Sequence, residues 1–176
     1  MATQGIELNL ANRGMRKAHL LIATVVLLLD RAAKWAVAQN IPLHDTIPVL
    51  PGFRLTHVQN HGAAFGLFAD HPSEWKLTIL VLFSLAAMTV VMYLLWKNSH
   101  TLSTTGIGLA LILGGAFGNL WDRIVNGHVL DFLDFYVQSY HWPAFNIADG
   151  GIVAGALLLV AEIILAKPPA EEAQSL

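Results

Sequence analysis

The sequence contains no cysteine and few charged residues. Without cysteine the chain can form no disulfide bond, no thiolate metal site and no cysteine nucleophile. Charged residues make up 12% of the 176 positions, about half of the roughly 25% found in soluble domains. A net charge of −2 gives no reason to expect a nucleic-acid partner. Hydrophobic residues reach 55% and the mean hydropathy is +0.56. The composition therefore indicates an integral membrane protein, and the length fits one domain.

Several motifs of metal and nucleophilic chemistry are also missing. The eight histidines are scattered, and none belongs to a His-Glu-x-x-His motif. His57 and His61 are four residues apart, as helical metal ligands are, but the sequence around them does not predict a helix. Neither a G-x-S-x-G motif nor a glycine-rich phosphate loop occurs. We therefore expect no metal and no cofactor.

Four long apolar segments are present instead. They predict transmembrane helices at about 18–39, 75–97, 105–125 and 146–166, each long enough to cross roughly 30 Å of hydrocarbon. The expected fold class is an all-α polytopic membrane protein with four transmembrane helices and a small extracytoplasmic β segment. All five tryptophans fall at predicted segment ends, as in the aromatic belts of membrane proteins: Trp35, Trp75, Trp96, Trp121 and Trp142.

The first apolar segment also has features of a cleavable signal peptide. A basic cluster precedes it, and Ala36, Val37 and Ala38 resemble a cleavage site. Against cleavage, Asp30 and Lys34 interrupt the region just before that site. We therefore favour a retained helix.

The connections between the spans differ in character. Residues 41–73 are rich in proline and glycine and are expected to lie on the bilayer surface, with a short strand or hairpin near Phe53–Val58. A loop of about twenty residues, rich in aspartate and aromatics, is expected between the third and fourth spans. Residues 168–176 are expected to be a disordered tail. From the distribution of lysine and arginine we expect both termini in the cytoplasm. We expect a single membrane domain that covers residues 1–176.

Asp131 and Asp149 are the candidate catalytic residues. Acids near hydrocarbon are costly and usually face a polar cavity, and both of these residues lie at span ends on the same outer face. Two close carboxylates share a proton, so one can accept a proton from water while the other donates one. Each could equally be a helix cap, and from spacing alone Asp122 or Asp134 could be the partner instead.

Other polar and small residues group near these acids. Asp122 can neutralise Arg123 or Lys34, and Asp30 lies one helical turn before Lys34, so those two can pair. Residues 60–66 predict a tight turn whose small side chains would let an extended peptide approach. Two pairs of glycines at i, i+4 spacing predict close helix packing: Gly114 with Gly118, and Gly151 with Gly155.

Four blocks of these residues carry a resemblance to a known family. In chain order they are LDRAAK at 29–34, QNHGAAFGLF at 59–68, GGAFGNLWDR at 114–123 leading into GHVLDF at 127–132, and PAFNIADGGIVAG at 143–155. Each block alone is a weak signal, and four in register are highly specific. Together they resemble the lipoprotein signal peptidase family, also called signal peptidase II.

The resemblance implies a bacterial membrane aspartyl endopeptidase that removes the signal peptide of prolipoproteins before a diacylglyceryl-modified cysteine. It implies no metal, a place in the cytoplasmic (inner) membrane with the site at the extracytoplasmic face, contact with membrane lipids, and inhibition by globomycin-type antibiotics. By motif position the catalytic pair is Asp131 and Asp149. Residues implied to bind substrate or support the site are Asp30, Lys34, Asn60, Gly62, Ala64, Phe65, Gly115, Gly118, Asn119, Asp122, Arg123, Val129, Phe145, Asn146 and Ala148.

The chain departs from the family pattern at two places. Family members commonly carry a hydroxyl-bearing residue after the last aspartate, where this chain has Gly150 and then Gly151. The first block lacks the usual Gln and Thr between Asp30 and Lys34. We expect activity to be retained and ligand contacts to differ. The segment at 41–73 would correspond to the family's small sheet and a mobile helix over the site.

Two other classes of function fit parts of the sequence. A small proton-coupled transporter would also place acids in the membrane, but it predicts acids near mid-membrane and repeat symmetry between halves. Here the acids gather at one face and no internal repeat occurs. A purely structural assembly factor would use only the glycine-lined helix faces.

Overall fold

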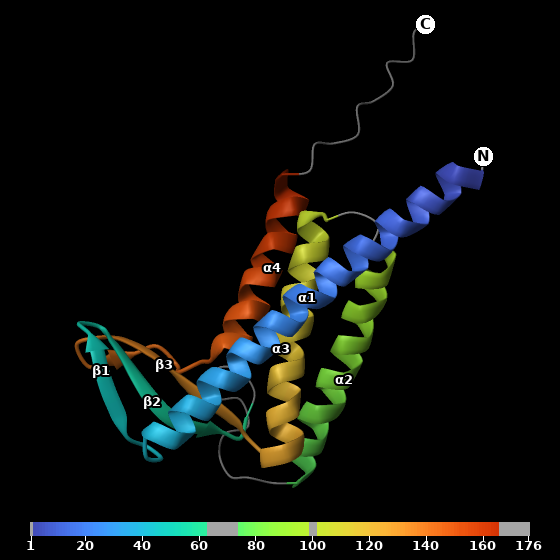
Figure 1. The fold of residues 1–176 in the computed structure, drawn as a ribbon. Coiled ribbons are helices and arrows are strands. Elements are labelled where there is room, and N and C mark those ends of the chain that lie inside the picture. The colour runs from blue at the N-terminus through green and yellow to red at the C-terminus, as the bar shows by residue number, and fades with distance from the viewer. Residues whose placement is uncertain (1, 63–73, 99–101, 166–176) are drawn as a thin grey trace, which may run out of the picture.

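Four long helices and a small sheet make up the computed structural model, which describes residues 2–62, 74–98 and 102–165. The helices are α1 (Ala2–Asn40), α2 (Glu74–Lys97), α3 (Thr104–Asn126) and α4 (Ile147–Leu165). Helix α3 lies in the middle and packs against each of the other three (Figure 1). The sheet stands to one side of the bundle, next to the C-terminal end of α1 and the N-terminal end of α4 (Figure 1).

Three of the helices are long and apolar enough to cross a membrane: α2 over Trp75–Lys97, α3 and α4. Half of the apolar stretch of α3 is buried in the protein, against 11% in α2 and in α4. This difference makes α3 the core helix and leaves the other two to present apolar side chains outward. Helix α1 falls outside this group of three because its apolar run contains Asp30, Arg31 and Lys34.

Both ends of α3 are capped. The Ser103 hydroxyl accepts a hydrogen bond from the Gly106 N–H at 3.1 Å, which satisfies one of the free donors of the first turn. At the other end Gly127 has φ 74°, in the left-handed region, and its N–H donates to the Arg123 carbonyl. This glycine reverses the chain, so the next strand runs back past the end of α3.

The sheet has four antiparallel strands in the order β1 (Thr46–Leu50), β2 (Phe53–Asn60), β3 (Val129–Val137) and β4 (Tyr140–His141). The hairpin expected near residues 53–58 is confirmed and is longer than expected. The connection expected to be a loop between the third and fourth spans instead contains strands β3 and β4, which take up about half of it. Its aspartates suggested a loop, but each one has polar partners in the folded chain, so an extended strand tolerates them.

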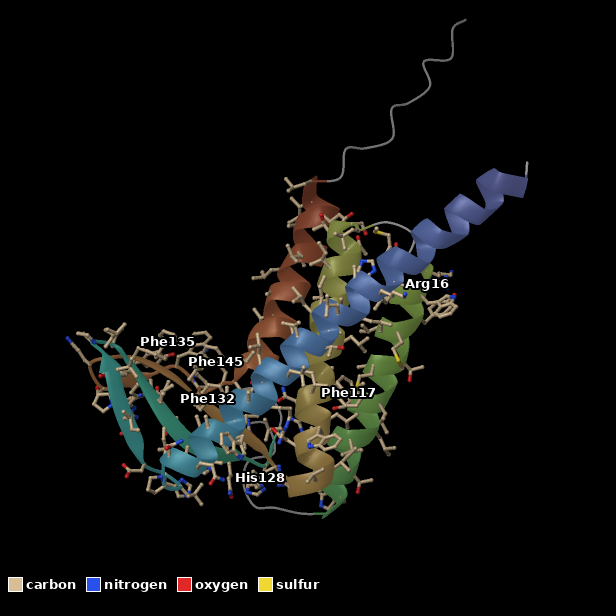
Figure 2. The ribbon with its side chains drawn as sticks, viewed as in Figure 1. Arg16, Phe117, His128, Phe132, Phe135 and Phe145 are labelled. Carbon is tan, nitrogen blue, oxygen red and sulfur yellow. The ribbon has the colours of Figure 1, made fainter. Side chains whose placement is uncertain are left out.

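A small apolar core joins the sheet to the bundle. It consists of Val37 and Ile41 at the end of α1 and Phe132 on β3. Beyond it, the ring of Phe135 stacks on Phe53 at 4.7 Å and on Phe145 at 5.9 Å between ring centroids. Figure 2 shows the three labelled phenylalanines of this region where the sheet meets the start of α4. The sheet is thereby held against the helix ends that carry the polar residues.

The predicted glycine contacts are confirmed as packing. A Cβ on Gly155 would overlap the carbonyl oxygen of Gly108, so α3 and α4 touch backbone to backbone there. A Cβ on Gly114 would likewise overlap the Ala23 carbonyl of α1. These approaches set the three helices close enough for side chains at their ends to meet.

Candidate active site

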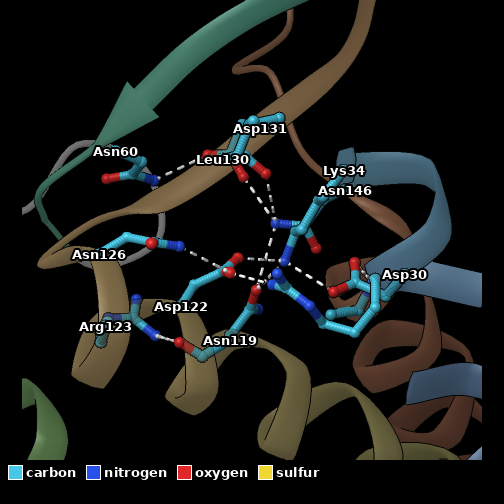
Figure 3. A network of polar contacts seen from close by, with 12 residues as sticks. Asp30, Lys34, Asn60, Asn119, Asp122, Arg123, Asn126, Leu130, Asp131 and Asn146 are labelled. Atoms are coloured by element: carbon cyan, nitrogen blue, oxygen red, sulfur yellow. Dashed lines mark hydrogen bonds and ion pairs between the residues drawn. The ribbon is translucent and has the colours of Figure 1, made fainter. Parts of the chain in front are cut away.

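Asp131 and Asp149 are brought to the same place from two different elements. Asp131 lies on β3, and Asp149 lies in the first turn of α4. The fully buried Asn146 joins them, because its Nδ2 donates to Asp131 Oδ1 at 2.7 Å and its Oδ1 accepts from the Asp149 N–H at 2.9 Å. The backbone N–H of Asn146 also faces Asp149 Oδ2 at 3.3 Å. Both carboxylates therefore contact one asparagine, and Figure 3 shows Asn146 between Asp131 and the α3 residue Asn119.

Asp131 is surrounded by amides and has no cation in direct contact among the described residues. Its second oxygen accepts from Asn60 Nδ2 at 2.9 Å, and its residue is only 3% exposed. Burial raises the pKa of Asp131 to about 7, and the nearby Asp149 carboxylate adds to the shift, while Asn60 and Asn146 partly oppose it. Asp131 therefore exchanges its proton near neutral pH.

Asp149 is held from the other side by α3. Asn119 Nδ2 donates to Asp149 Oδ1 at 2.8 Å. The side-chain oxygen of Asn119, Oδ1, in turn accepts hydrogen bonds from Lys34 Nζ at 3.1 Å and from Asn146 Nδ2 at 3.2 Å. Because these two donors both point at Oδ1, the side-chain amide of Asn119 is oriented with its NH2 group toward Asp149.

A buried charge network supports this amide. Lys34 Nζ lies 2.8 Å from Asp30 Oδ2 and 2.8 Å from Asp122 Oδ2, and the Lys34 side chain is 2% exposed. The expected pairing of Asp30 with Lys34 is confirmed. Asp30 also accepts the Ala148 N–H at 2.9 Å, so an acid on α1 caps the first turn of α4. Removal of α1 after Ala38 would take Asp30 and Lys34 out of this network.

Of the two partners expected for Asp122, Lys34 is confirmed, and Arg123 forms no ion pair with Asp122 among the described contacts. Adjacent residues on a helix do not face each other, and Asp122 pairs with Lys34 and with Arg31. Arg123 donates to two carbonyl oxygens, those of Asn119 at 3.4 Å and Gly62 at 3.3 Å. It therefore ties the end of β2 to α3 beside the acids.

Arg31 is the site residue that sequence reasoning did not select. Its guanidinium forms an ion pair with Asp122 across the α1–α3 contact. No role or partner was predicted for Arg31 from the sequence. The available signal was an excess of acids near Lys34, since Asp30 and Asp122 together need a second cation.

Asp134, which spacing had left open as a partner, belongs to a separate cluster. It accepts from Arg54 Nε at 2.6 Å and lies 2.9 Å from His141 Nδ1. Burial alone would raise the pKa of Asp134, but the hydrogen bonds from His141 and Arg54 outweigh it and the pKa is lowered. Residues 131 and 134 are three apart on a strand and so point to opposite faces.

The remaining predicted residues mostly shape the backbone. A Cβ on Gly115 would overlap the Ala148 carbonyl, and one on Gly118 would lie 2.8 Å from Asp30 Oδ2. Both glycines lie against neighbouring helices, which leave no room for a side chain at these positions. Gly62 donates to Asn60 Oδ1 at 2.9 Å. Val129 is buried, and Phe145 pairs with Leu133 through its backbone. Ala64, Phe65 and the helix expected over the site lie outside the described residues.

A cavity of about 220 Å³ opens beside Asp131. It is formed by the end of β2, by β3 and by the segment that leads into α4. Its lining residues are Val58, Gln59, Asn60, His61, Asp131, Pro143 and Ala144.

The chemistry available at this site is that of paired carboxylates. In the part of the chain that the structure describes, no three histidine, aspartate or glutamate side chains are grouped to hold a metal ion. Two acids joined by one amide, with one carboxyl poised to exchange its proton near pH 7, can supply a general base and a general acid together. This arrangement suits hydrolysis by an activated water.

Comparisons with known proteins all match membrane enzymes or signal peptidases. A family model for signal peptidase (SPase) II matches residues 22–165. A lipoprotein signal peptidase of Desulforapulum autotrophicum is 46% identical over 151 residues, 85% of this chain and 93% of the relative. One from Solibacter usitatus is 44% identical over 147 residues, 83% of this chain and 90% of the relative. A bacterial membrane enzyme solved by the in meso method at 2.3 Å resolution superposes with a TM-score of 0.78 at 26% identity, covering 91% of this chain and 95% of its own.

Proposed function

The chain belongs to the signal peptidase II family, and from this premise we propose that it cuts prolipoproteins just before the diacylglyceryl-modified cysteine, with Asp131 and Asp149 as the catalytic pair. Membership of the family makes it a membrane peptidase. The observation that carries the proposed pair is the single buried asparagine, Asn146, which contacts the Asp131 carboxyl group through its side-chain amide and the Asp149 carboxyl group through its backbone N–H. No other two acids among the described residues share such a contact.

In the proposed reaction a water molecule lies between the two aspartates. The ionised carboxylate takes a proton from the water, whose oxygen attacks the carbonyl carbon that precedes the cysteine. The protonated carboxyl group donates its proton to the carbonyl oxygen, which gives a tetrahedral intermediate. When the C–N bond breaks, the amine of the cysteine takes up a proton from the pair. The pKa of Asp131 near 7 supports this cycle, because both of its protonation states are then populated.

The residues around the pair hold it in position. Asn119 and Asn146 donate hydrogen bonds to the carboxylates, and the buried ammonium of Lys34 orients Asn119. Arg123 has its positive charge beside the site and binds the Gly62 carbonyl, which places the end of β2 near the reacting bond. These roles follow the positions expected from the family motifs.

The proposed topology has four spanning helices with both termini in the cytoplasm and the site at the extracytoplasmic face of the bacterial inner membrane. The exposed side of helix α1 supports this topology, because apolar side chains face outward there. Asp30 and Lys34 of the same helix are buried against α3 and α4. The charges therefore do not prevent this helix from contacting lipid. Its exposed apolar residues are Leu20, Leu21, Val25, Leu28 and Leu29. Globomycin-type peptides are proposed as inhibitors.

The test is cleavage of a diacylglyceryl prolipoprotein by the purified protein with Asp131→Asn or Asp149→Asn. Each change keeps the shape and removes one titratable group, so we expect the rate to fall by about 10⁴-fold or more, as for other residues that act as a unit in catalysis. Asp134→Asn is the matched control, since it lies on the same strand in a separate cluster and should stay within about threefold of the unmodified rate. Near-normal turnover by either folded dyad variant would remove that aspartate from the mechanism.

A further inference from the structure

The cavity beside Asp131 takes no part in the reaction described above. Its walls come from β2, β3 and the segment before α4, and none of its lining residues belongs to a helix. It adjoins the proposed catalytic pair at Asp131, whose Oδ1 contacts Asn146 and whose Oδ2 contacts Asn60, and both Asp131 and Asn60 line the cavity. A substrate peptide bound across the two aspartates therefore has the residues on one side of the cut over the helix ends and the residues on the other side over this cavity.

We propose that this cavity binds the side chain of the residue that follows the lipid-modified cysteine, and that it selects an uncharged polar side chain there. The inference rests on the proposed function. The part of the substrate before the cut is a membrane-embedded signal sequence and belongs on the helix side, so the part after the cut faces the cavity.

The direction of the side chains supports the same assignment. In an extended peptide successive side chains point to opposite sides. The diacylglyceryl group on the cysteine must point toward the lipid around the helices. The side chain of the next residue then points away from the lipid, toward the sheet and its cavity.

The size of the cavity limits what it can hold. At about 30 Å³ for each water in the liquid, a cavity of about 220 Å³ holds roughly seven waters. That is room for one medium side chain, and it is below the 300–1,000 Å³ typical of pockets for whole small molecules. The side chain of tryptophan, the largest of the twenty, would take up most of this room and is expected to fit least well.

The lining chemistry favours an amide or hydroxyl side chain. Gln59 and His61 bring an amide and an imidazole to one part of the wall, and Val58, Pro143 and Ala144 form the apolar part. Asp131 lies at the cavity edge, so an acidic ligand side chain would meet a like charge. A basic one would hold Asp131 in its ionised form and so disturb the shared proton.

The test uses diacylglyceryl-modified peptides that differ only in the residue after the cysteine, which is glycine, asparagine, aspartate, methionine or tryptophan. For the unmodified protein we expect kcat/KM for asparagine to exceed that for aspartate and for tryptophan by about tenfold each, the range that one pocket contact supplies. Equal kcat/KM for all five peptides would overturn the inference and leave the proposed function intact. Failure to cut any of them would overturn the proposed function itself.

Two variants sharpen the result. Ala144→Leu reduces the cavity, so the asparagine-to-glycine ratio of kcat/KM should fall about tenfold. Ala156→Leu is the matched control, because Ala156 is exposed on α4 away from the cavity and the ratio should not change. Gln59→Met removes the amide at similar volume, and the asparagine-to-methionine ratio should fall about fivefold. Unchanged ratios in both cavity variants would exclude this pocket as a specificity site.

Discussion

Two aspartates on one strand, three residues apart, show how differently the same side chain behaves in two surroundings. Asp131 contacts only the amides of Asn60 and Asn146 and lies near a second acid, and its pKa is raised to about 7. Asp134 contacts Arg54 and His141, and its pKa is lowered. Both side chains have little exposed surface, but burial is the largest cause of the raised pKa of Asp131. At Asp134 the hydrogen bonds and charges of its partners outweigh the effect of burial on the pKa.

The comparison also separates two uses of a buried charge. In the cluster of Arg54, Asp134 and His141, here called the distal cluster, the guanidinium of Arg54 contacts the acid directly and favours its ionised form. In the candidate site the ammonium of Lys34 contacts Asp30 and Asp122, and its hydrogen bond to Asn119 links it to the proposed catalytic pair. An acid kept one amide away from its cation can stay protonated part of the time. The four predictions below test this difference in order of expected effect.

Replacing the shared asparagine should have the largest effect. Asn146→Leu removes the amide that joins Asp131 to Asp149, so we expect kcat to fall by about 10²- to 10³-fold, as when a preorganised donor is lost from an active site. The measurement is single-turnover cleavage of a diacylglyceryl prolipoprotein. His141→Gln in the distal cluster is the control and should keep kcat within about twofold. Equal losses in the two variants would mean that Asn146 acts only through folding.

Removing the central cation should destabilise the protein most. Lys34→Met leaves Asp30 and Asp122 buried without their shared ammonium, which should cost about 3–5 kcal/mol of unfolding free energy. Arg54→Met removes a half-exposed partner of Asp134 while His141 remains, and should cost about 1 kcal/mol. Thermal unfolding in detergent compares the two. A smaller loss for Lys34→Met than for Arg54→Met would contradict the buried-network interpretation.

The two aspartates should give opposite pH dependences of stability. Because the folded pKa of Asp131 is raised above its unfolded value, its folded state holds the proton more tightly, and stability falls as pH rises from about 4 to 7. The expected change is on the order of 2–4 kcal/mol. Asp134 has a lowered pKa, so its contribution is present above the ordinary value and is lost as the solution becomes more acidic. Denaturation of Asp131→Asn and Asp134→Asn across pH separates them. An unchanged slope between pH 4 and 7 in Asp131→Asn would refute the assignment.

The smallest effect is expected next to Asp149. Gly150 lies in the first turn of α4, and a Cβ there would meet nothing within 4 Å. Gly150→Ala should therefore stabilise the helix by about 0.5–1 kcal/mol and leave cleavage within about twofold. Gly155→Ala is the contrasting variant, because its Cβ would overlap the Gly108 carbonyl and destabilise the protein. Unfolding measurements in detergent check both, and a loss of stability for Gly150→Ala would show that the open space is needed.

Much of the fold could be predicted from local pattern. Long apolar runs bounded by tryptophans predicted the helical segments, and the observed α2, α3 and α4 agree with the expected spans to within a residue or so at each end. Gly114, Gly118, Gly151 and Gly155 were predicted to pack closely because small residues at that spacing let helices touch. These features depend on residues near each other in the chain, which is why the pattern was sufficient.

Strand β3 and the contacts between distant residues could not be predicted in this way, whereas the pairing of Asp30 with Lys34, one helical turn apart, was predicted. An aspartate-rich stretch resembles a loop until Asn60, Asn146, Arg54 and His141 are placed around its two acids. Arg31 had no predicted partner, and only the packing of α1 against α3 brings it to Asp122. Such partners are 7 to 91 positions apart, and most of them lie beyond any local window.

The sequence by itself determined that this is a helical membrane protein, and its ordered motif blocks singled out Asp131 and Asp149. Composition and apolar length are properties of the chain alone, because the cost of placing charges in lipid is paid residue by residue. Only the tertiary structure decided which acids share an amide and which meet a cation. The β2–β3 register and the close packing of α1, α3 and α4 set those distances, and the electrostatic effect of a partner depends on distance and burial in the folded chain.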